Sequence, residues 1–201
     1  MAERKLTSGE TALAKKVFKA SIDYSKVKIH NEKYAFFQPN NSGMTPNGEI
    51  YIAGVYRKDY SLQSSAMQGF FIHEMVHVWQ YQLKILNPIT AAIGESVIHF
   101  FDYSKAYEYS LDGTRDILEY NIEQQAAIIE DYFRIFQTGL LPIPGRVKNT
   151  GALSSYKPLY LQVLAKFIKK PEYAKHEIVC KRSTVGHPSS RHTICRRVQQ
   201  I

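Results

Sequence analysis

The spacing of apolar residues near the start of the chain predicts an amphipathic helix. The segment Thr7–Glu10 is a capping box, in which Thr7 is the N-cap and Glu10 reaches back from the third helical position. Beyond it, Leu13, Val17 and Ala20 recur on one helical face. We therefore expect a helix that begins after Thr7, ends at about Ala20 and buries that face.

Three short segments that follow predict the strands of a small antiparallel sheet. Val27–His30 alternates between apolar and polar residues, and Tyr34–Gln38 is a second candidate. Glu49–Ala53 is the third, and it follows Pro46-Asn47-Gly48, a strong turn signal. In folds of this kind an edge strand often binds an extended peptide. Glu49–Ala53 is therefore either a peptide-binding edge or an ordinary structural strand.

The rest of the regular pattern is helical. Four segments have helical spacing or an apolar run of helical length: Ser65–Leu83, Ile89–Phe101, Arg115–Phe136 and Tyr156–Ile168. The longest of them places five apolar residues on one face: Leu118, Ile122, Ala126, Ile129 and Phe133. Several helices with a few strands indicate an α+β domain, and 201 residues suffice for one domain with a sizeable core.

Charge separates the end of the chain from this domain. The net charge is +8, and residues 175–201 hold six Lys or Arg against the single acid Glu177, which is +5 of that charge. Both cysteines, Cys180 and Cys195, lie there and either form one disulfide or remain free thiols. We expect a folded domain over residues 1–174 and a basic, flexible tail over 175–201. Because no aromatic residues are interleaved with its charges, the tail does not indicate nucleic-acid binding.

Two features concern membranes and export. The N-terminal residues Met1–Leu6 lack the apolar run of a signal peptide. No stretch of about 18 uncharged apolar residues predicts a membrane span. If the protein acts outside the producing cell, we expect it to be made in the cytoplasm and exported by a secretion apparatus.

The candidate chemistry lies in the predicted helix Ser65–Leu83, which contains His73-Glu74-Met75-Val76-His77. Positions i and i+4 lie on one helical face, about 6 Å apart. Each histidine can therefore place a nitrogen roughly 2.0–2.1 Å from one zinc ion. Glu74 would lie beside the metal and accept a proton from zinc-bound water. Apolar residues surround the motif, and buried histidines need partners or a metal.

A catalytic zinc needs a third protein ligand. No histidine follows His77 at close helical spacing, so we expect a carboxylate from a second helix. The longest predicted helix offers Glu119, Glu123 and Glu130. We predict Glu123, because the alanines at positions 126 and 127 would let two helices approach closely around a metal. Glu119 is the main rival.

These residues resemble those of known proteins. The motif His73–His77 followed by a glutamate on a later helix is similar to the gluzincin group of zinc peptidases. Leu6–Glu10, Asp23–Val27, Met44–Gly48 and His73–Gln80 together resemble the small Vgr/Rhs-associated proteins. That group includes metallopeptidase domains carried on the VgrG spikes of bacterial type VI secretion systems. The resemblance covers roughly residues 6–170.

The resemblance implies a zincin-like fold, in which the motif helix packs against a second long helix, and a zinc-dependent peptidase activity. It implies zinc as the cofactor, with the motif histidines His73 and His77 and a later glutamate as its ligands. The residues themselves assign that glutamate to Glu123 and the catalytic base to Glu74. The expected role is an antibacterial toxin that a VgrG spike or Rhs carrier delivers into a competing cell. Its partners would be a protein or cell-wall peptide substrate and a cognate immunity protein.

Several assignments stay open. One alternative function is a zinc amidase or endopeptidase that cleaves peptidoglycan. Another is a non-catalytic accessory of the secretion apparatus, although a structural zinc has no need of Glu74. The gluzincin pattern has an acid a few residues after the ligand glutamate, whereas this chain has Ala127. The group that would stabilise an oxyanion is open among four tyrosines: Tyr103, Tyr107, Tyr109 and Tyr120.

Overall fold

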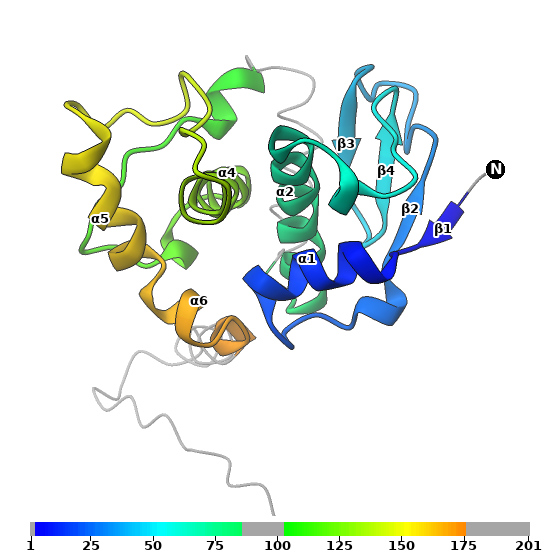
Figure 1. Cartoon of the computed structure of the whole chain (residues 1–201), viewed down its shortest axis with the longest axis horizontal. Coiled ribbons are helices and arrows are strands. Elements are labelled where there is room, and N and C mark those ends of the chain that lie inside the picture. Colours follow the sequence, from blue (N-terminus) through cyan, green and yellow to red (C-terminus); the bar gives the residue numbers. More distant parts are fainter. Residues whose placement is uncertain (1–2, 86–102, 176–201) are drawn as a thin grey trace, which may run out of the picture.

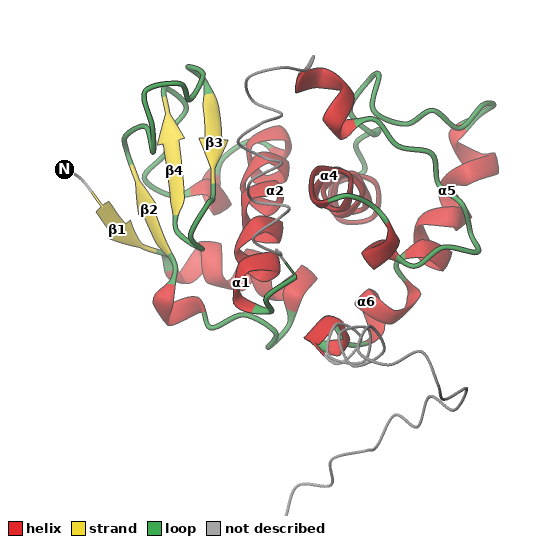
Figure 2. Ribbon diagram, turned by 180° about the vertical axis from the view of Figure 1, so that it is seen from behind, coloured by secondary structure: helices red, strands yellow, loops and turns green. Residues whose placement is uncertain are grey.

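The computed structural model describes residues 3–85 and 103–175. A four-stranded sheet lies at one side of the molecule, with the helices beside it (Figures 1 and 2). Helix α2 (Ser65–Gln82) lies next to the sheet, α4 (Ile122–Phe133) lies beyond α2, and α5 (Leu153–Val163) is farther still. The prediction of an α+β fold is confirmed. Helices α2 and α4 make the most extensive contact between any two of these elements.

The sheet has the order β1 (Glu3–Lys5), β2 (Lys28–His30), β4 (Ile50–Ala53) and β3 (Ser42–Met44). Strands β1 and β2 are antiparallel, as are β3 and β4, but β2 and β4 run parallel. The sheet is therefore mixed, and the prediction of an antiparallel sheet is wrong. The reason is the connection: the chain reverses through β3 first, so β4 returns alongside β2 in the same direction.

This strand order also decides which strand is an edge. The predicted strand Glu49–Ala53 is confirmed as β4, but β4 lies inside the sheet, paired on both sides by β2 and β3. It is therefore a structural strand and offers no free edge to a peptide. The outer strand on the side of α2 is β3 (Figure 2).

The prediction of a strand at Tyr34–Gln38 is wrong, because the segment forms turns. The buried side chain of Gln38 replaces the missing strand partners. Its Oε1 atom accepts a hydrogen bond from the backbone N–H of Tyr34, and its Nε2 atom donates to the carbonyls of Ser42 and Tyr51. These bonds fold the segment into a compact loop that leads into β3.

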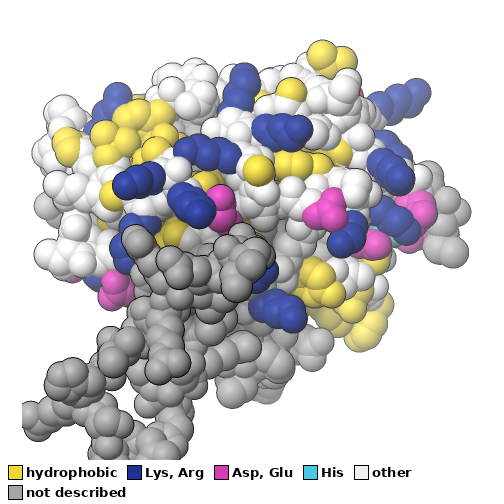
Figure 3. Space-filling model, turned by 90° about the horizontal axis from the view of Figure 1, so that it is seen from below, with side chains coloured by type: hydrophobic (Ala, Val, Ile, Leu, Met, Phe, Trp, Pro, Cys, Tyr) yellow, Lys and Arg dark blue, Asp and Glu magenta, His cyan; other side chains and the backbone are white. Residues whose placement is uncertain are grey.

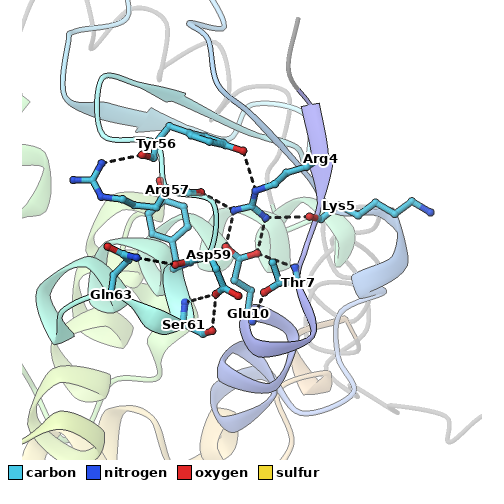
Figure 4. A network of polar contacts seen from close by, with 10 residues as sticks. Arg4, Lys5, Thr7, Glu10, Tyr56, Arg57, Asp59, Ser61 and Gln63 are labelled. Carbon is cyan, nitrogen blue, oxygen red and sulfur yellow. Dashed lines mark hydrogen bonds and ion pairs between the residues drawn. The ribbon is translucent and has the colours of Figure 1, made fainter.

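Helix α1 (Ser8–Phe18) begins at the predicted capping box, which is confirmed. Thr7 Oγ1 accepts a hydrogen bond from the backbone N–H of Glu10 at 3.0 Å, and Glu10 Oε2 accepts from that of Thr7 at 2.9 Å. The buried Glu10 carboxylate also accepts two hydrogen bonds from Arg4 and one from the backbone N–H of Tyr60. This network joins β1, α1 and the loop that precedes α2 (Figure 4).

Helix α2 covers nearly all of the predicted segment Ser65–Leu83 and begins at Ser64, whose hydroxyl caps it. Most of its residues from Phe71 to Gln80 are buried, because the helix contacts the sheet, α1 and α4. Trp79 donates a hydrogen bond to the carbonyl of Pro171, and its ring meets Phe167 edge-on. Helix α6 (Ala165–Lys169), which carries Phe167, thereby holds the C-terminal end of α2.

Helix α4 is shorter than the predicted segment Arg115–Phe136. Asn121 forms a capping box at its start, so the chain before it makes only the single turn η4 (Ile117–Glu119). Beyond α4 the chain continues as the π-helical segment η5 (Arg134–Thr138), which ends at Gly139 in the left-handed conformation. Both alanines, Ala126 and Ala127, are fully buried in α4. They lie three and four residues after Glu123, so helical spacing places them near the face of α4 that carries Glu123.

The predicted helix Tyr156–Ile168 is divided into α5 and α6, with Leu164 between them. No helix of residues 3–85 and 103–175 is long and apolar enough to cross a membrane. Figure 3 shows Lys and Arg side chains spread over the underside of the molecule, so basic residues are not confined to the tail. The predicted helix Ile89–Phe101 and the two cysteines lie outside the described residues.

Candidate metal centre

Two facing helices bring the predicted ligands together. The helical spacing of His73 and His77 puts both rings on the face of α2 that meets α4, and the ring centroids lie 5.0 Å apart. Glu123 lies in the first turn of α4, directly opposite. One nitrogen of each histidine and one carboxylate oxygen of Glu123 all lie within 4.8 Å of one another.

The carboxylate of Glu123 points at both histidines. Its Oε2 atom lies 3.6 Å from His73 Nε2 and 3.4 Å from His77 Nε2. This oxygen is buried and makes no hydrogen bond in the part of the chain that the structure describes, although both nitrogens lie at ion-pair distance. It is the one buried side-chain polar atom there without a hydrogen bond. The three atoms therefore converge on a point that none of them fills.

The charged side chains around this point shift one another's pKa values. Burial disfavours the charged form of His73, but Glu123 and Glu130 outweigh that effect and raise its pKa to about 10. Burial also favours the neutral form of Glu123, yet the two imidazoles lower its pKa below the usual range. Without another cation, the carboxylates therefore hold protons on the rings. A metal ion here would replace those protons.

The second nitrogen of His73 is held from α4. His73 Nδ1 donates a hydrogen bond to Glu130 Oε2 at 3.1 Å, and Arg146 also donates to that oxygen. Burial alone would raise the pKa of Glu130, but His73 and Arg146 lower it to about 2. The bond to Nδ1 leaves Nε2 of His73 available as a ligand atom.

Glu130 is the acid on α4 that contacts a motif histidine, in place of the acid expected at position 127. Ala127 stands where an acid was expected, but Glu130 lies seven residues after Glu123, two helical turns along the same face of α4. It contacts the far side of His73 and is not among the three residues that surround the common point. The rival Glu119 is exposed in η4 and accepts a hydrogen bond from the backbone of Asp116.

His77 is held by an amide that sequence reasoning missed. His77 Nδ1 donates a hydrogen bond to Gln80 Oε1 at 2.8 Å. Gln80 is fully buried, and its Nε2 atom donates to the carbonyl of Ile122 and to Gln125 Oε1. The same side chain therefore orients His77 and ties α2 to the first turn of α4, next to Glu123. Its position three residues after His77 on one helix was the available signal.

Glu74 points away from α4 and toward the sheet. Its carboxylate is buried, and Oε2 accepts a hydrogen bond from Thr45 Oγ1 at 2.7 Å. Burial raises the pKa of Glu74, against the opposing effect of the two histidines and Thr45. This carboxylate therefore accepts a proton more readily than an exposed glutamate does, which suits a general base.

The tyrosines considered for oxyanion stabilisation differ in their distance from the histidines and in their partners. Tyr109 donates to Asp131 and contacts Tyr160, and Tyr120 donates to the carbonyl of Ser110, so both belong to buried structural networks. The Tyr107 ring lies 5.6 Å from that of His73, centroid to centroid, with the Arg146 guanidinium over its face. The side chain of Tyr103 lies outside the described part. Tyr107 is the tyrosine that the structure brings to the histidines.

The fold and the site together define a class of protein. It is an α+β domain in which a buried His-Glu-x-x-His helix faces a carboxylate on a second helix, and the three side chains form a candidate metal centre. No model of a known protein family matches the chain.

The chain belongs to the family of the effector domain of Pseudomonas aeruginosa VgrG2b. The solved structure of that domain matches with a TM-score of 0.59 and 38% sequence identity, over 73% of this chain and 85% of that one. The chain is also 42% identical, over 134 residues, to the type VI secretion system spike protein VgrG2b of Pseudomonas aeruginosa. This match includes 66% of the chain but only 13% of the spike protein's length. The resemblance to domains carried on VgrG spikes is confirmed.

Proposed function

We propose that the protein is a zinc-dependent metallopeptidase with His73, His77 and Glu123 as metal ligands and Glu74 as general base. The observation that carries this proposal is Glu123 Oε2, a buried oxygen that faces two imidazole nitrogens and has no donor among the described residues. Leaving such an atom without a partner costs free energy. A cation at the common point would remove that cost.

The three residues fit zinc. Two ligand atoms bound to a tetrahedral zinc at roughly 2.0–2.1 Å lie about 3.3 Å apart. The distances from Glu123 Oε2 to the two nitrogens, 3.4 and 3.6 Å, are close to that separation. Two imidazoles and one carboxylate also form one of the donor sets of catalytic zinc sites, which keep the fourth position open for water or substrate.

The chain's own residues would move the protons. Zinc supplies a Lewis acid, which makes water more acidic and polarises a substrate carbonyl. Glu74 accepts the proton of the attacking water and passes it to the departing amine as the carbon–nitrogen bond breaks. The water oxygen ends in the new carboxyl group. Glu130 and Gln80 accept from the Nδ1 atoms of His73 and His77, which would keep both Nε2 atoms turned to the metal once zinc has displaced their protons.

We also propose that the protein is an effector of type VI secretion. The relative that defines the family is named as the effector domain of VgrG2b, and VgrG2b is named as a spike protein of this secretion system. By analogy, the chain would be delivered into a target cell on a VgrG spike, and the producing cell would hold a cognate immunity protein. Its substrate would be a protein or the peptide part of the cell wall.

The test combines metal analysis with hydrolysis. We expect about one zinc per chain in purified protein, and cleavage of a protein or peptide library that Glu74→Gln abolishes while it retains zinc. Cleavage of purified peptidoglycan alone would favour the amidase or endopeptidase alternative. A zinc-loaded protein that cleaves neither substrate, with Glu74→Gln fully toxic on delivery, would favour a non-catalytic accessory.

A further inference from the structure

The base and the metal ligands are held from different sides. The partners of the two histidines, Glu130 and Gln80, lie on α4 and α2. Glu74 is instead held from the outer strand β3 and the residue after it. We propose that Gly43 and Thr45 are positioning residues, which hold the Glu74 carboxylate where it accepts its proton. The catalytic consequence rests on the proposed function, whereas the contacts do not.

Thr45 fixes one oxygen of the carboxylate. Its hydroxyl donates to Glu74 Oε2 at 2.7 Å, and both residues are buried. Within residues 3–85 and 103–175, no second hydrogen bond to this carboxylate occurs, so the Thr45 hydroxyl is its one hydrogen-bond donor there. A hydrogen bond to Oε2 leaves Oε1 as the oxygen that can accept a proton. A valine has nearly the same shape as threonine but would remove this bond.

Gly43 leaves the space that the Glu74 carboxylate occupies. Position 43 in β3 and position 45 just after it both face Glu74, as their contacts with its side chain show. A Cβ atom at Gly43 would lie 2.5 Å from Glu74 Cδ and 3.0 Å from Cγ, and closer still to Oε1. Gly43 is not in the left-handed backbone region, so its backbone does not require glycine. Here glycine serves the close approach of the carboxylate to β3.

The geometry separates turnover from metal binding. His73, His77 and Glu123 make no hydrogen bond to β3 or Thr45 in the part of the chain that the structure describes. Changing the strand should therefore move or loosen Glu74 and leave the metal centre in place. This also gives a role to Thr45 in the segment Met44–Gly48, where it directly follows β3 and precedes the turn Pro46-Asn47-Gly48.

The test uses the full chain and four variants. Thr45→Val removes the hydroxyl, Thr45→Ser retains it, and Gly43→Ala adds the Cβ. Thr114→Val is the matched control, because its hydroxyl also donates to a carboxylate, Asp112 Oδ1, at 2.7 Å, but on the exposed surface. Zinc content, kcat and KM on a cleaved peptide, and crystal structures of the zinc-loaded proteins are measured for each variant.

We expect Thr45→Val to lower kcat by about 10–100-fold with little change in KM or zinc content. Thr45→Ser should restore kcat to within a few-fold, and Gly43→Ala should lose at least as much as Thr45→Val. In the crystal structures Glu74 should have one position in the wild type and Thr45→Ser, and another or several in the other two. Thr114→Val should match the wild type in every measurement.

Two results would overturn the inference. One is a Thr45→Val protein with wild-type kcat and an unmoved Glu74, and the other is a Gly43→Ala protein that accommodates its Cβ without displacing Glu74. The structural comparison needs no turnover. If the wild type cleaved nothing, the proposed function would fail, while the position of Glu74 would still decide the role of the strand.

Discussion

Two buried glutamates of this protein differ in how their charge is satisfied. Glu10 accepts two hydrogen bonds from Arg4 and one each from the backbone N–H groups of Thr7 and Tyr60. Glu123 Oε2 faces two imidazole nitrogens and accepts no hydrogen bond from the described residues. Glu10 lies in the first turn of α1 and Glu123 in the first turn of α4, so both glutamates lie near the start of a helix.

The difference teaches what each carboxylate is for. Glu10 is complete within the folded chain, and its neighbours supply a full countercharge and all the donors that it needs, which is the expected state of a structural buried acid. Glu123 has only the two imidazoles at ion-pair distance and no hydrogen bond to Oε2 from the described residues. Its neighbours are bases that can share one cation with it, which is the arrangement of a ligand site.

The largest expected effect is on zinc binding. Glu123→Ala, His73→Ala and His77→Ala should each weaken zinc binding by ~1000-fold or more, or about 4 kcal/mol, because two remaining ligands hold zinc poorly. Far-UV circular dichroism should show an unchanged fold. Competition titration with a chelating dye measures the affinity. Glu119→Ala is the control: it should bind as the wild type does, and a loss there that matched Glu123→Ala would move the site.

Glu10→Ala should lower the stability of the fold and leave zinc binding unchanged. Removing this carboxylate leaves the partly buried Arg4 without its ion-pair partner and the backbone N–H groups of Thr7 and Tyr60 without their acceptor, so we expect a loss of about 3 kcal/mol in the free energy of unfolding. Urea unfolding of the zinc-free protein measures it. Zinc stoichiometry should remain one per chain. A stable Glu10→Ala protein that lost zinc would contradict the division between the two glutamates.

Glu130→Gln should have an intermediate effect. The amide oxygen can still accept from His73 Nδ1, but the charge that favours the ring's orientation is lost. Changes of this kind typically cost about 10–100-fold in metal affinity. The same titration tests it. An affinity equal to that of the wild type would show that the contact between Glu130 and His73 does not support the metal centre.

Zinc affinity should also depend on pH. The pKa of His73 is raised to about 10 in the zinc-free protein, so the ring is protonated at neutral pH and must release a proton to bind zinc. Affinity should therefore rise with pH, by about tenfold per unit for each proton released. Calorimetry in buffers of different ionisation enthalpy counts the protons. Zinc binding without proton release near pH 7 would contradict the raised pKa.

Zinc-free stability should follow the same group. A raised folded-state pKa stabilises the protein fully below the ordinary value of 6.5 and no longer does so once pH rises through about 10. Unfolding at several pH values in this window, with His73→Gln as the comparison, measures the contribution. The variant should lack the decline that the wild type has.

Local signals made part of this account predictable. The capping box at Thr7–Glu10, the helix around His73–His77 and the placement of Glu123 opposite it follow from residue spacing within one or two helices. Sequence reasoning preferred Glu123 to Glu119 because of the small residues near it, and it kept Glu119 as the main rival. The roles of Glu123 as a metal ligand and of Glu74 as the base remain predictions.

Partners from distant segments were not predictable. Thr45 reaches Glu74 only because β3 is the outer strand next to α2, and that follows from the mixed order of the sheet. The antiparallel prediction failed because pairing between strands is set by the path of the chain, not by alternation within a strand. Glu130 lay in the right helix, but its contact with His73 depends on how α4 is rotated against α2.

The central claim is that one zinc ion binds between α2 and α4. Crystals of the zinc-loaded protein, with anomalous scattering recorded on both sides of the zinc edge, test it most directly. We predict a single anomalous peak within roughly 2.0–2.1 Å of His73 Nε2 and His77 Nε2 and about 2.0–2.2 Å from Glu123 Oε2. No peak at this point in zinc-saturated crystals, or a peak whose carboxylate ligand is not Glu123, would contradict the account.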